Sequence, residues 1–153
     1  MRMILFMLGI AFIPVVAWIA LLLWLRHRLE RTAAEMRHAC VRQGETIMLG
    51  PASTNFRGSD FTYGRVKGNG VICVTDRRIL FQKIFGEGTE IPLTNVTRLD
   101  VTNSFRGFST GTGASHLVIH TRDGNRIGFL VKGAAEWKRS VEGLLGRWTG
   151  QRM

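Results

Sequence analysis

The sequence predicts a mainly β domain, an antiparallel sandwich or barrel, with an apolar helix before it and an amphipathic helix at its end. Three observations lead to this prediction. Residues 3–25 hold no charged side chain, residues 46–131 hold about seven short apolar stretches between turn residues, and residues 134–148 return to a helical period.

The uncharged run over residues 3–25, MILFMLGIAFIPVVAWIALLLWL, predicts a transmembrane helix. At a rise of about 1.5 Å per residue it would be roughly 34 Å long, which is enough to cross a hydrocarbon core of about 30 Å. A signal peptide has a shorter apolar region of about 7–15 residues and a small-residue cleavage site nearby. We therefore expect an uncleaved anchor.

The arginines beside this run predict its orientation. Arg2 precedes the run, and five arginines follow it within residues 26–42. The positive-inside rule then places the N-terminus outside and the remaining chain in the cytoplasm, as a single-pass protein of the cell membrane. Cytoplasmic thiols stay reduced, so Cys40 and Cys73 are not expected to form a disulfide.

Residues 26–43 are predicted to form a basic juxtamembrane helix with a narrow apolar stripe. The stripe consists of Leu29, Ala33, Met36 and Cys40. Such a stripe fits a coiled-coil dimer, a helix lying on anionic lipid, or a connecting helix that packs on its own domain. Because the stripe is short and its side chains are small, we favour the connecting helix.

Short apolar or alternating stretches between turn residues predict the strands. They are 46–49, 61–66, 71–75, 79–84, 96–102, 116–121 and 126–131, with a further edge strand or turn at 90–93. Small and polar residues predict loops at 52–60 and 104–115, and Asn69-Gly70 is a strong turn signal. The number and spacing of these strands favour an antiparallel sandwich or barrel.

Residues 134–148 have the period of an amphipathic helix. Its apolar face consists of Trp137, Val141, Leu144, Leu145 and Trp148. Two tryptophans on one face predict a docked helix, because burying each is worth a few kcal/mol at roughly 25 cal/mol per Å². We expect this helix to cover the open end of a barrel, with residues 149–153 as a tail.

Several segments in order resemble a known family. They are GVICVTDRRILF at 70–81, EIPLTNV at 90–96, LVIHTRDG at 117–124 and Trp137. This order is similar to that of bacterial PH-like and GRAM-like domains of the pleckstrin-homology superfold, over residues 44–148. The resemblance implies a seven-stranded antiparallel barrel or sandwich capped by a C-terminal helix. It also implies binding of lipid headgroups, peptides or proteins rather than catalysis.

Five cations flank the predicted turns and are candidate lipid-binding residues. They are Arg57, Arg65, Lys67, Arg77 and Arg78. Guanidinium groups suit phosphate, and the resemblance implies that basic residues around the first hairpin hold a phosphoinositide headgroup. The alternative, which we favour, is general attraction to anionic lipid, worth about 1 kcal/mol per charge without a pocket.

The segment Phe105, Arg106 and Phe108 offers two aromatic rings beside an arginine and is a candidate partner-binding loop. Aromatic and arginine side chains are the favoured anchors of protein interfaces. The alternative is that Phe105 continues the inward face of the preceding strand.

No enzyme, cofactor or metal site is predicted. Residues 107–111 match G-x-S-x-G, but a glycine-rich loop follows where a nucleophile elbow needs a helix. Despite the net charge of +10, the chain lacks an aromatic–basic stacking platform for nucleic acid. We therefore expect a membrane-tethered adaptor, assembly factor or accessory subunit that binds a membrane-protein partner, with anionic phospholipid headgroup binding as the alternative.

Overall fold

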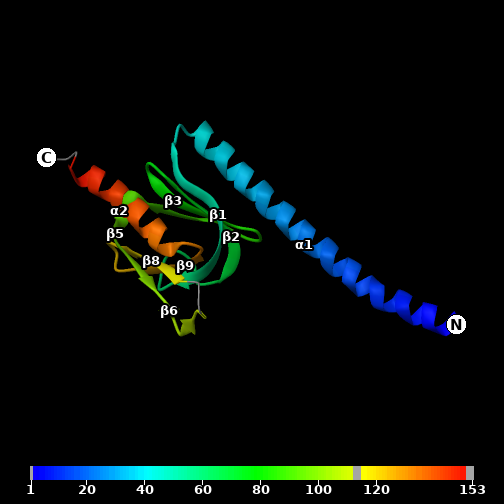
Figure 1. Cartoon of the computed structure of the whole chain (residues 1–153). Coiled ribbons are helices and arrows are strands. Elements are labelled where there is room, and N and C mark those ends of the chain that lie inside the picture. Colours follow the sequence, from blue (N-terminus) through cyan, green and yellow to red (C-terminus); the bar gives the residue numbers. More distant parts are fainter. Residues whose placement is uncertain (1, 112–114, 151–153) are drawn as a thin grey trace.

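The computed structural model describes the backbone of residues 2–111 and 115–150 and the side chains of residues 14–111 and 115–147. It is a β-sandwich with a long N-terminal helix and a C-terminal helix (Figure 1). The helices are α1 (Arg2–Arg42), the 3₁₀ helix η1 (Leu93–Asn95) and α2 (Ala134–Gly150). The sheet contains β1 (Ile47–Ser59), β2 (Gly68–Thr75), β3 (Arg78–Lys83), β4 (Thr89–Pro92), β5 (Val96–Thr102), β8 (Ser115–Thr121) and β9 (Arg126–Val131), and β6 (Ser104–Phe105) pairs with β7 (Phe108–Ser109) in a small hairpin.

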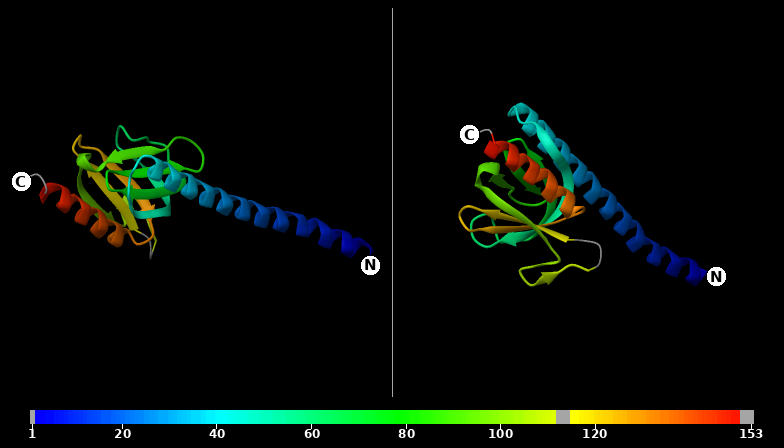
Figure 2. Two further views of the ribbon diagram at one scale, coloured as in Figure 1. Left: turned by 90° about the horizontal axis from the view of Figure 1, so that it is seen from above. Right: turned by 60° about the vertical axis from the view of Figure 1, so that its left-hand side comes forward.

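The main sheet is antiparallel, with the strand order β4-β3-β2-β1-β9-β8-β5. The long strand β1 joins its two halves, because Thr54 pairs with Gly70 of β2 on one side and with Val131 of β9 on the other. The strand curves, so that the two halves face each other (Figures 1 and 2). The mainly β prediction is therefore correct, and the predicted strands at 96–102 and 126–131 are β5 and β9.

The largest error among the strands concerns β1. Residues 52–60 were predicted as a loop, yet all but the last belong to β1. The predicted strand at 61–66 is wrong, because residues 60–67 form the loop between β1 and β2. The predicted turn at Asn69-Gly70 lies inside β2. Gly70 is needed there for close packing, because a Cβ at this position would lie 2.2 Å from the carbonyl oxygen of Gln82 on β3.

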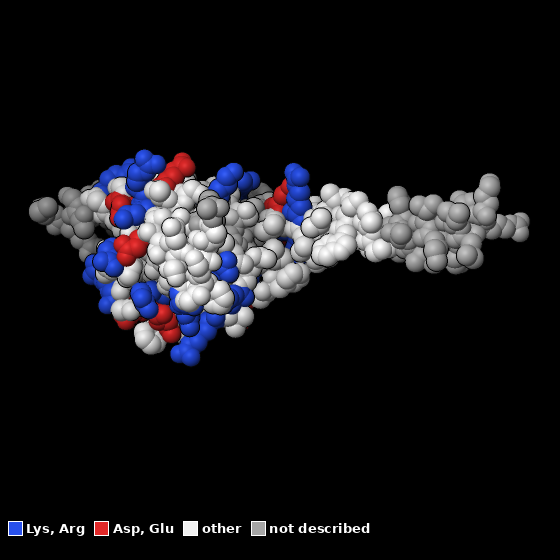
Figure 3. Space-filling model, turned by 60° about the horizontal axis from the view of Figure 1, so that its bottom comes forward, with Lys and Arg blue, Asp and Glu red and all other residues white. Residues whose placement is uncertain are grey.

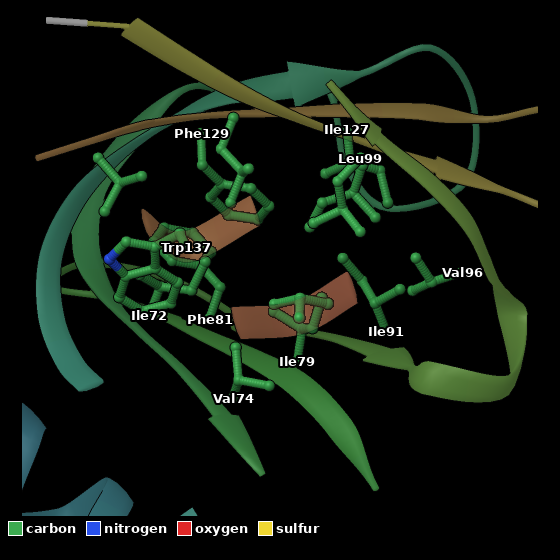
Figure 4. Close-up of a cluster of buried hydrophobic side chains, with 14 of the residues drawn as sticks. Ile72, Val74, Ile79, Phe81, Ile91, Val96, Leu99, Ile127, Phe129 and Trp137 are labelled. Carbon is green, nitrogen blue, oxygen red and sulfur yellow. The ribbon is translucent and has the colours of Figure 1, made fainter. Parts of the chain in front are cut away.

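The core lies between the two halves of the sheet, under α2. Its largest fully buried side chains include Phe56, Phe129, Ile72, Ile79, Ile91, Leu99, Leu117, Ile119 and Ile127. Figure 4 shows side chains from both halves pointing toward one another. On α2, Trp137, Val141 and Leu144 are buried against this core, so the helix is docked through its apolar face as predicted. The side chain of Trp148 lies outside the described residues.

The predicted transmembrane helix over residues 3–25 is wrong. Among the residues that the structure describes, no helix contains a stretch long and apolar enough to cross a membrane. The side chains of residues 3–13 lie outside the described part, and the remaining apolar stretch, residues 14–25, would extend only about 18 Å. The predicted single-pass location in the cell membrane depended on that helix and is wrong with it.

The C-terminal half of α1 packs on the outer face of β1 and β2. A second apolar cluster forms there from Met36, Cys40, Val71 and Cys73, with Leu29, Ala33, Ile47 and Leu80 packed at its edges. The predicted stripe on residues 29–40 therefore covers the helix's own domain, which confirms the connecting-helix interpretation. Further toward the N-terminus, Trp24 stacks on Phe85 of the β3–β4 loop, with ring centroids 6.0 Å apart.

Candidate binding surface

The β6–β7 hairpin lies within the predicted glycine-rich loop. Arg106 and Gly107 form its two-residue turn, and both have positive φ angles, +50° and +76°. Two consecutive residues in this region make a type I′ turn, which suits the right-handed twist of a hairpin. The left-handed conformation is unfavourable for arginine, so other contacts must stabilise the turn.

Phe105 anchors this hairpin to the outer face of β9. Its side chain is 6% exposed, and its ring lies directly over Gly128. A Cβ on Gly128 would lie 2.3 Å from the Phe105 ring, so only glycine leaves room for the ring. Phe105 therefore neither contacts solvent nor continues the inward face of β5.

His116 of β8 lies under the same hairpin and is fully buried. Its ring centroid is 6.3 Å from that of Phe105, and neither ring nitrogen makes a hydrogen bond. Burial is the main cause that lowers the pKa of His116, and the positive charge of the nearby Arg57 lowers it further. The polar backbone of Thr102 acts in the opposite direction but does not outweigh them. The folded protein therefore favours the neutral imidazole.

Two cations lie against the ring of Phe108, whose side chain is 42% exposed, and a third lies in the same hairpin. The Nζ atom of Lys67 is 3.0 Å from the centre of the Phe108 ring, and the Cζ atom of Arg57 is 5.9 Å from it. Arg106 donates a hydrogen bond from Nη1 to the Ser59 carbonyl oxygen over 2.5 Å. We call Arg57, Lys67, Arg106 and Phe108 the basic–aromatic surface. It joins residues from β1, the β1–β2 loop and the hairpin.

The cations of the basic–aromatic surface have no acidic partner. Within the described residues, no aspartate or glutamate forms an ion pair with Arg57, Lys67 or Arg106. The backbone of Arg65 lies close to this surface. A Cβ atom added to Gly58 would be 3.0 Å from the Arg65 carbonyl oxygen and 3.1 Å from Nη1 of Arg106. Blue side chains are spread around the β-domain in Figure 3, so basicity alone does not distinguish this surface; its distinguishing feature is the pair of cations against the exposed Phe108 ring.

The other two candidate cations lie at the opposite end of β2. Roughly 25 Å of strand separates Lys67 from Arg77 and Arg78, so a single headgroup cannot contact all five predicted residues. Arg77 is exposed at the β2–β3 turn. Arg78 instead pairs with Glu45 at 2.8 Å and Glu90 at 2.5 Å.

The contacts of Arg78 are structural, because they join two parts of its own chain. It also donates a hydrogen bond to the Gln43 side chain, so it ties the residues after α1 to the edge strand β4. Burial alone would lower the pKa of Arg78, but the hydrogen bonds and charges of Glu45 and Glu90 outweigh burial and raise it. Arg78 therefore forms its ion pairs with two acids of its own chain.

The G-x-S-x-G stretch does not form a nucleophile elbow. Its serine, Ser109, is the last residue of the two-residue strand β7, and the stretch contains the hairpin turn rather than a strand-to-helix junction. Sequence reasoning missed Gly128 as part of the site. An isolated glycine within a strand pattern is the signal for such a close approach, although the pattern does not say which side chain approaches.

Comparison with known proteins does not assign the chain to a family. No protein-family model matches the chain, and no curated protein matches it significantly. A solved structure of the C-terminal domain of an unknown protein from Leishmania infantum is similar at 16% identity and a TM-score of 0.49, covering 73% of this chain and 95% of that one. An allosterically inhibited Vav1 structure is similar at 13% identity and a TM-score of 0.43, covering 78% of this chain and 34% of that one. This chain thus spans about a third of that Vav1 chain, and both TM-scores are too low to support an argument.

Proposed function

We propose that this chain is a non-catalytic, PH-like interaction module, an adaptor that binds a protein partner through the basic–aromatic surface. The PH-like assignment is supported by the sequence motifs, by the seven-stranded antiparallel sheet and by the C-terminal helix that covers its core. The observation that carries the binding proposal is the Lys67–Phe108 pair, flanked by Arg57, because neither cation forms an ion pair with an acid of the described residues.

The chemistry of this surface defines its partner. Phe108 provides an aromatic contact that is partly open to solvent, and the two cations at its ring favour an anionic counterpart. Aromatic and arginine side chains that lie together are typical anchors of interfaces. The partner segment therefore carries acidic side chains next to an apolar one, so that it neutralises the cations and covers the ring.

Two substitutions that remove the same charge test this proposal. In Lys67→Gln the cation over Phe108 is lost, whereas in Arg77→Gln an exposed cation is lost at the far end of β2. With a photo-crosslinking residue at the exposed position 109 of the full-length chain, next to Phe108, we expect a specific crosslink to an acidic protein partner. Lys67→Gln should lower its yield about tenfold and Arg77→Gln should not. Equal yields for the two variants would contradict the proposal.

Anionic phospholipid headgroups are the second candidate ligand. The observation in their favour is that Phe61 and Val66, in the same loop as Lys67, are 67% and 73% exposed and could enter a lipid surface beside the cations. Vesicles of phosphatidylcholine, with and without phosphatidylserine or a phosphoinositide, separate the two ligands. Because both variants carry the same exposed apolar side chains on α1, the relevant result is the difference between Lys67→Gln and Arg77→Gln. A headgroup-selective loss in Lys67→Gln alone would favour lipid over protein.

A further inference from the structure

The two cysteines of the chain meet where α1 packs on the sheet. Cys40 lies at the end of the helix stripe, and Cys73 lies on the outer face of β2, whose neighbours Ile72 and Val74 point into the core. Both thiols are reduced and buried, at 1% and 0% exposure. Both side chains belong to one buried apolar cluster, and each thiol influences the pKa of the other.

A groove gives access to this pair from one side. It lies between α1 and strands β3 and β4, has a volume of about 560 Å³, and Cys40 forms part of its wall together with Met36 and Leu80. Cys73 does not line the groove. Of the two thiols, Cys40 is therefore the one that a small reagent in this groove would reach first.

We propose that Cys40 and Cys73 form a thiol–disulfide modification site, and that a small disulfide, acting as the oxidant, converts the pair into an intrachain disulfide. In the first step the Cys40 sulfur attacks the reagent's S–S bond, which releases one reagent thiol and leaves a mixed disulfide on Cys40. In the second step the Cys73 sulfur attacks the Cys40 sulfur and releases the second reagent thiol. The protein loses two electrons and two protons, and the reagent gains both.

The surroundings of the two thiols determine how fast these steps are. Burial raises the pKa of Cys40, and burial with the neighbouring Cys40 raises the pKa of Cys73 to about 12. Because the thiolate is the nucleophile, the reaction is slow at neutral pH and accelerates as the pH rises. The second step is intramolecular, between two side chains of the same buried cluster, so the mixed disulfide should not accumulate.

The new bond would fix α1 to β2. The outer-face contact now depends on a small apolar cluster, and a covalent link would prevent the helix from leaving the sheet. Closing the chain segment between the two cysteines also restricts the unfolded state, so the melting temperature should rise by on the order of 10 °C.

The test treats the full-length chain with 2-hydroxyethyl disulfide at pH 8.5 and follows its mass and peptide map without reduction. We expect the loss of two hydrogen atoms per chain, one crosslinked peptide pair containing Cys40 and Cys73, and a raised melting temperature that a reducing agent reverses. Cys73→Ala should stop at a mixed disulfide on Cys40, gaining one hydroxyethylthio group.

Three outcomes would overturn the proposal. They are a stable mixed disulfide in the native chain, disulfides only between chains, and thiols that remain unreacted in the folded chain while the guanidinium-unfolded chain reacts fully. The peptide map of the unsubstituted chain decides the question even if Cys73→Ala does not fold.

Discussion

At the scale of single residues, Arg78 shows why a cation beside a predicted turn need not be a ligand site. Its guanidinium contacts Glu45, whose side chain is only 6% exposed, and Glu90, which is 63% exposed. An exposed ion pair contributes little, so the pairing with Glu45 dominates. The motif resemblance does not indicate that the Arg78 side chain contacts the residues that follow α1.

Replacing Arg78 with alanine should destabilise the protein, because it leaves the Glu45 carboxylate buried without a partner. Loss of one member of a buried pair predicts a decrease in unfolding free energy of about 3 kcal/mol. Arg77→Ala is the matched control, since Arg77 is exposed at the same turn, and it should change the free energy by less than about 0.5 kcal/mol. Urea unfolding of both variants measures this, and equal losses would show that the Glu45 contact is not stabilising.

His116 predicts a dependence of stability on pH. Because its folded-state pKa is lowered, the unfolded chain binds the proton first as the pH falls below about 6.5. The stability from the neutral ring is therefore complete above that pH and is lost as the pH falls toward the folded-state pKa. In His116→Leu the urea midpoint should decrease less between pH 7.5 and pH 5.5 than in the unsubstituted protein. Identical decreases would exclude a role for His116.

At the scale of elements, the alternation of apolar and polar residues predicted β5 correctly. In β5 the alternation of Leu99 with Arg98 and Asp100 is visible in the sequence, and the strand was predicted with its correct bounds. The strand β1 was predicted wrongly because residues 52–60, apart from Phe56 and Arg57, are small or polar, while their strand conformation comes from pairing with β2 and β9. Partners distant in sequence overrode the local composition.

For the candidate site too, the sequence identified the residues but not how they come together. The sequence identified Arg57, Lys67, Arg106 and Phe108 as separate candidates for two different ligands. Only the hairpin's position over β9 brings them into one surface. That position depends on the Gly128–Phe105 contact, which links residues on different strands and has no local signature.

Gly128→Ala should therefore detach the hairpin from the sheet. The added methyl group would occupy the position of the Phe105 ring, and overpacking of this kind costs about 1–3 kcal/mol. Once detached, the exposed turn at Arg106 should be cut by trypsin several times faster than in the unsubstituted protein. Gly111→Ala is the control, because a Cβ there meets nothing within 4 Å. Unchanged protection at Arg106 in Gly128→Ala would mean that the ring can move aside without releasing the hairpin.

At the scale of the whole molecule, the two halves of the sheet share one aromatic centre. Phe56 on β1, Phe81 on β3 and Phe129 on β9 form a triangle with ring centroids 5.2–5.4 Å apart. Because β1 also pairs with both halves, neither half has a core of its own. We therefore expect the β-sandwich and α2 to unfold in one cooperative transition.

Phe56→Ala tests this cooperativity. Deleting a fully buried ring costs about 3–5 kcal/mol, and here the loss should appear equally in both halves. Guanidinium unfolding is followed by far-UV circular dichroism, which reports the strands, and by tryptophan fluorescence, which includes Trp137 of α2 on the core. Both transitions should move together to lower denaturant, whereas Phe61→Ala, at a 67% exposed position, should move neither. If the fluorescence transition of Phe56→Ala separated from the dichroism transition, α2 and its half of the sheet would be independently stable, and the shared aromatic centre would not be what unites the fold.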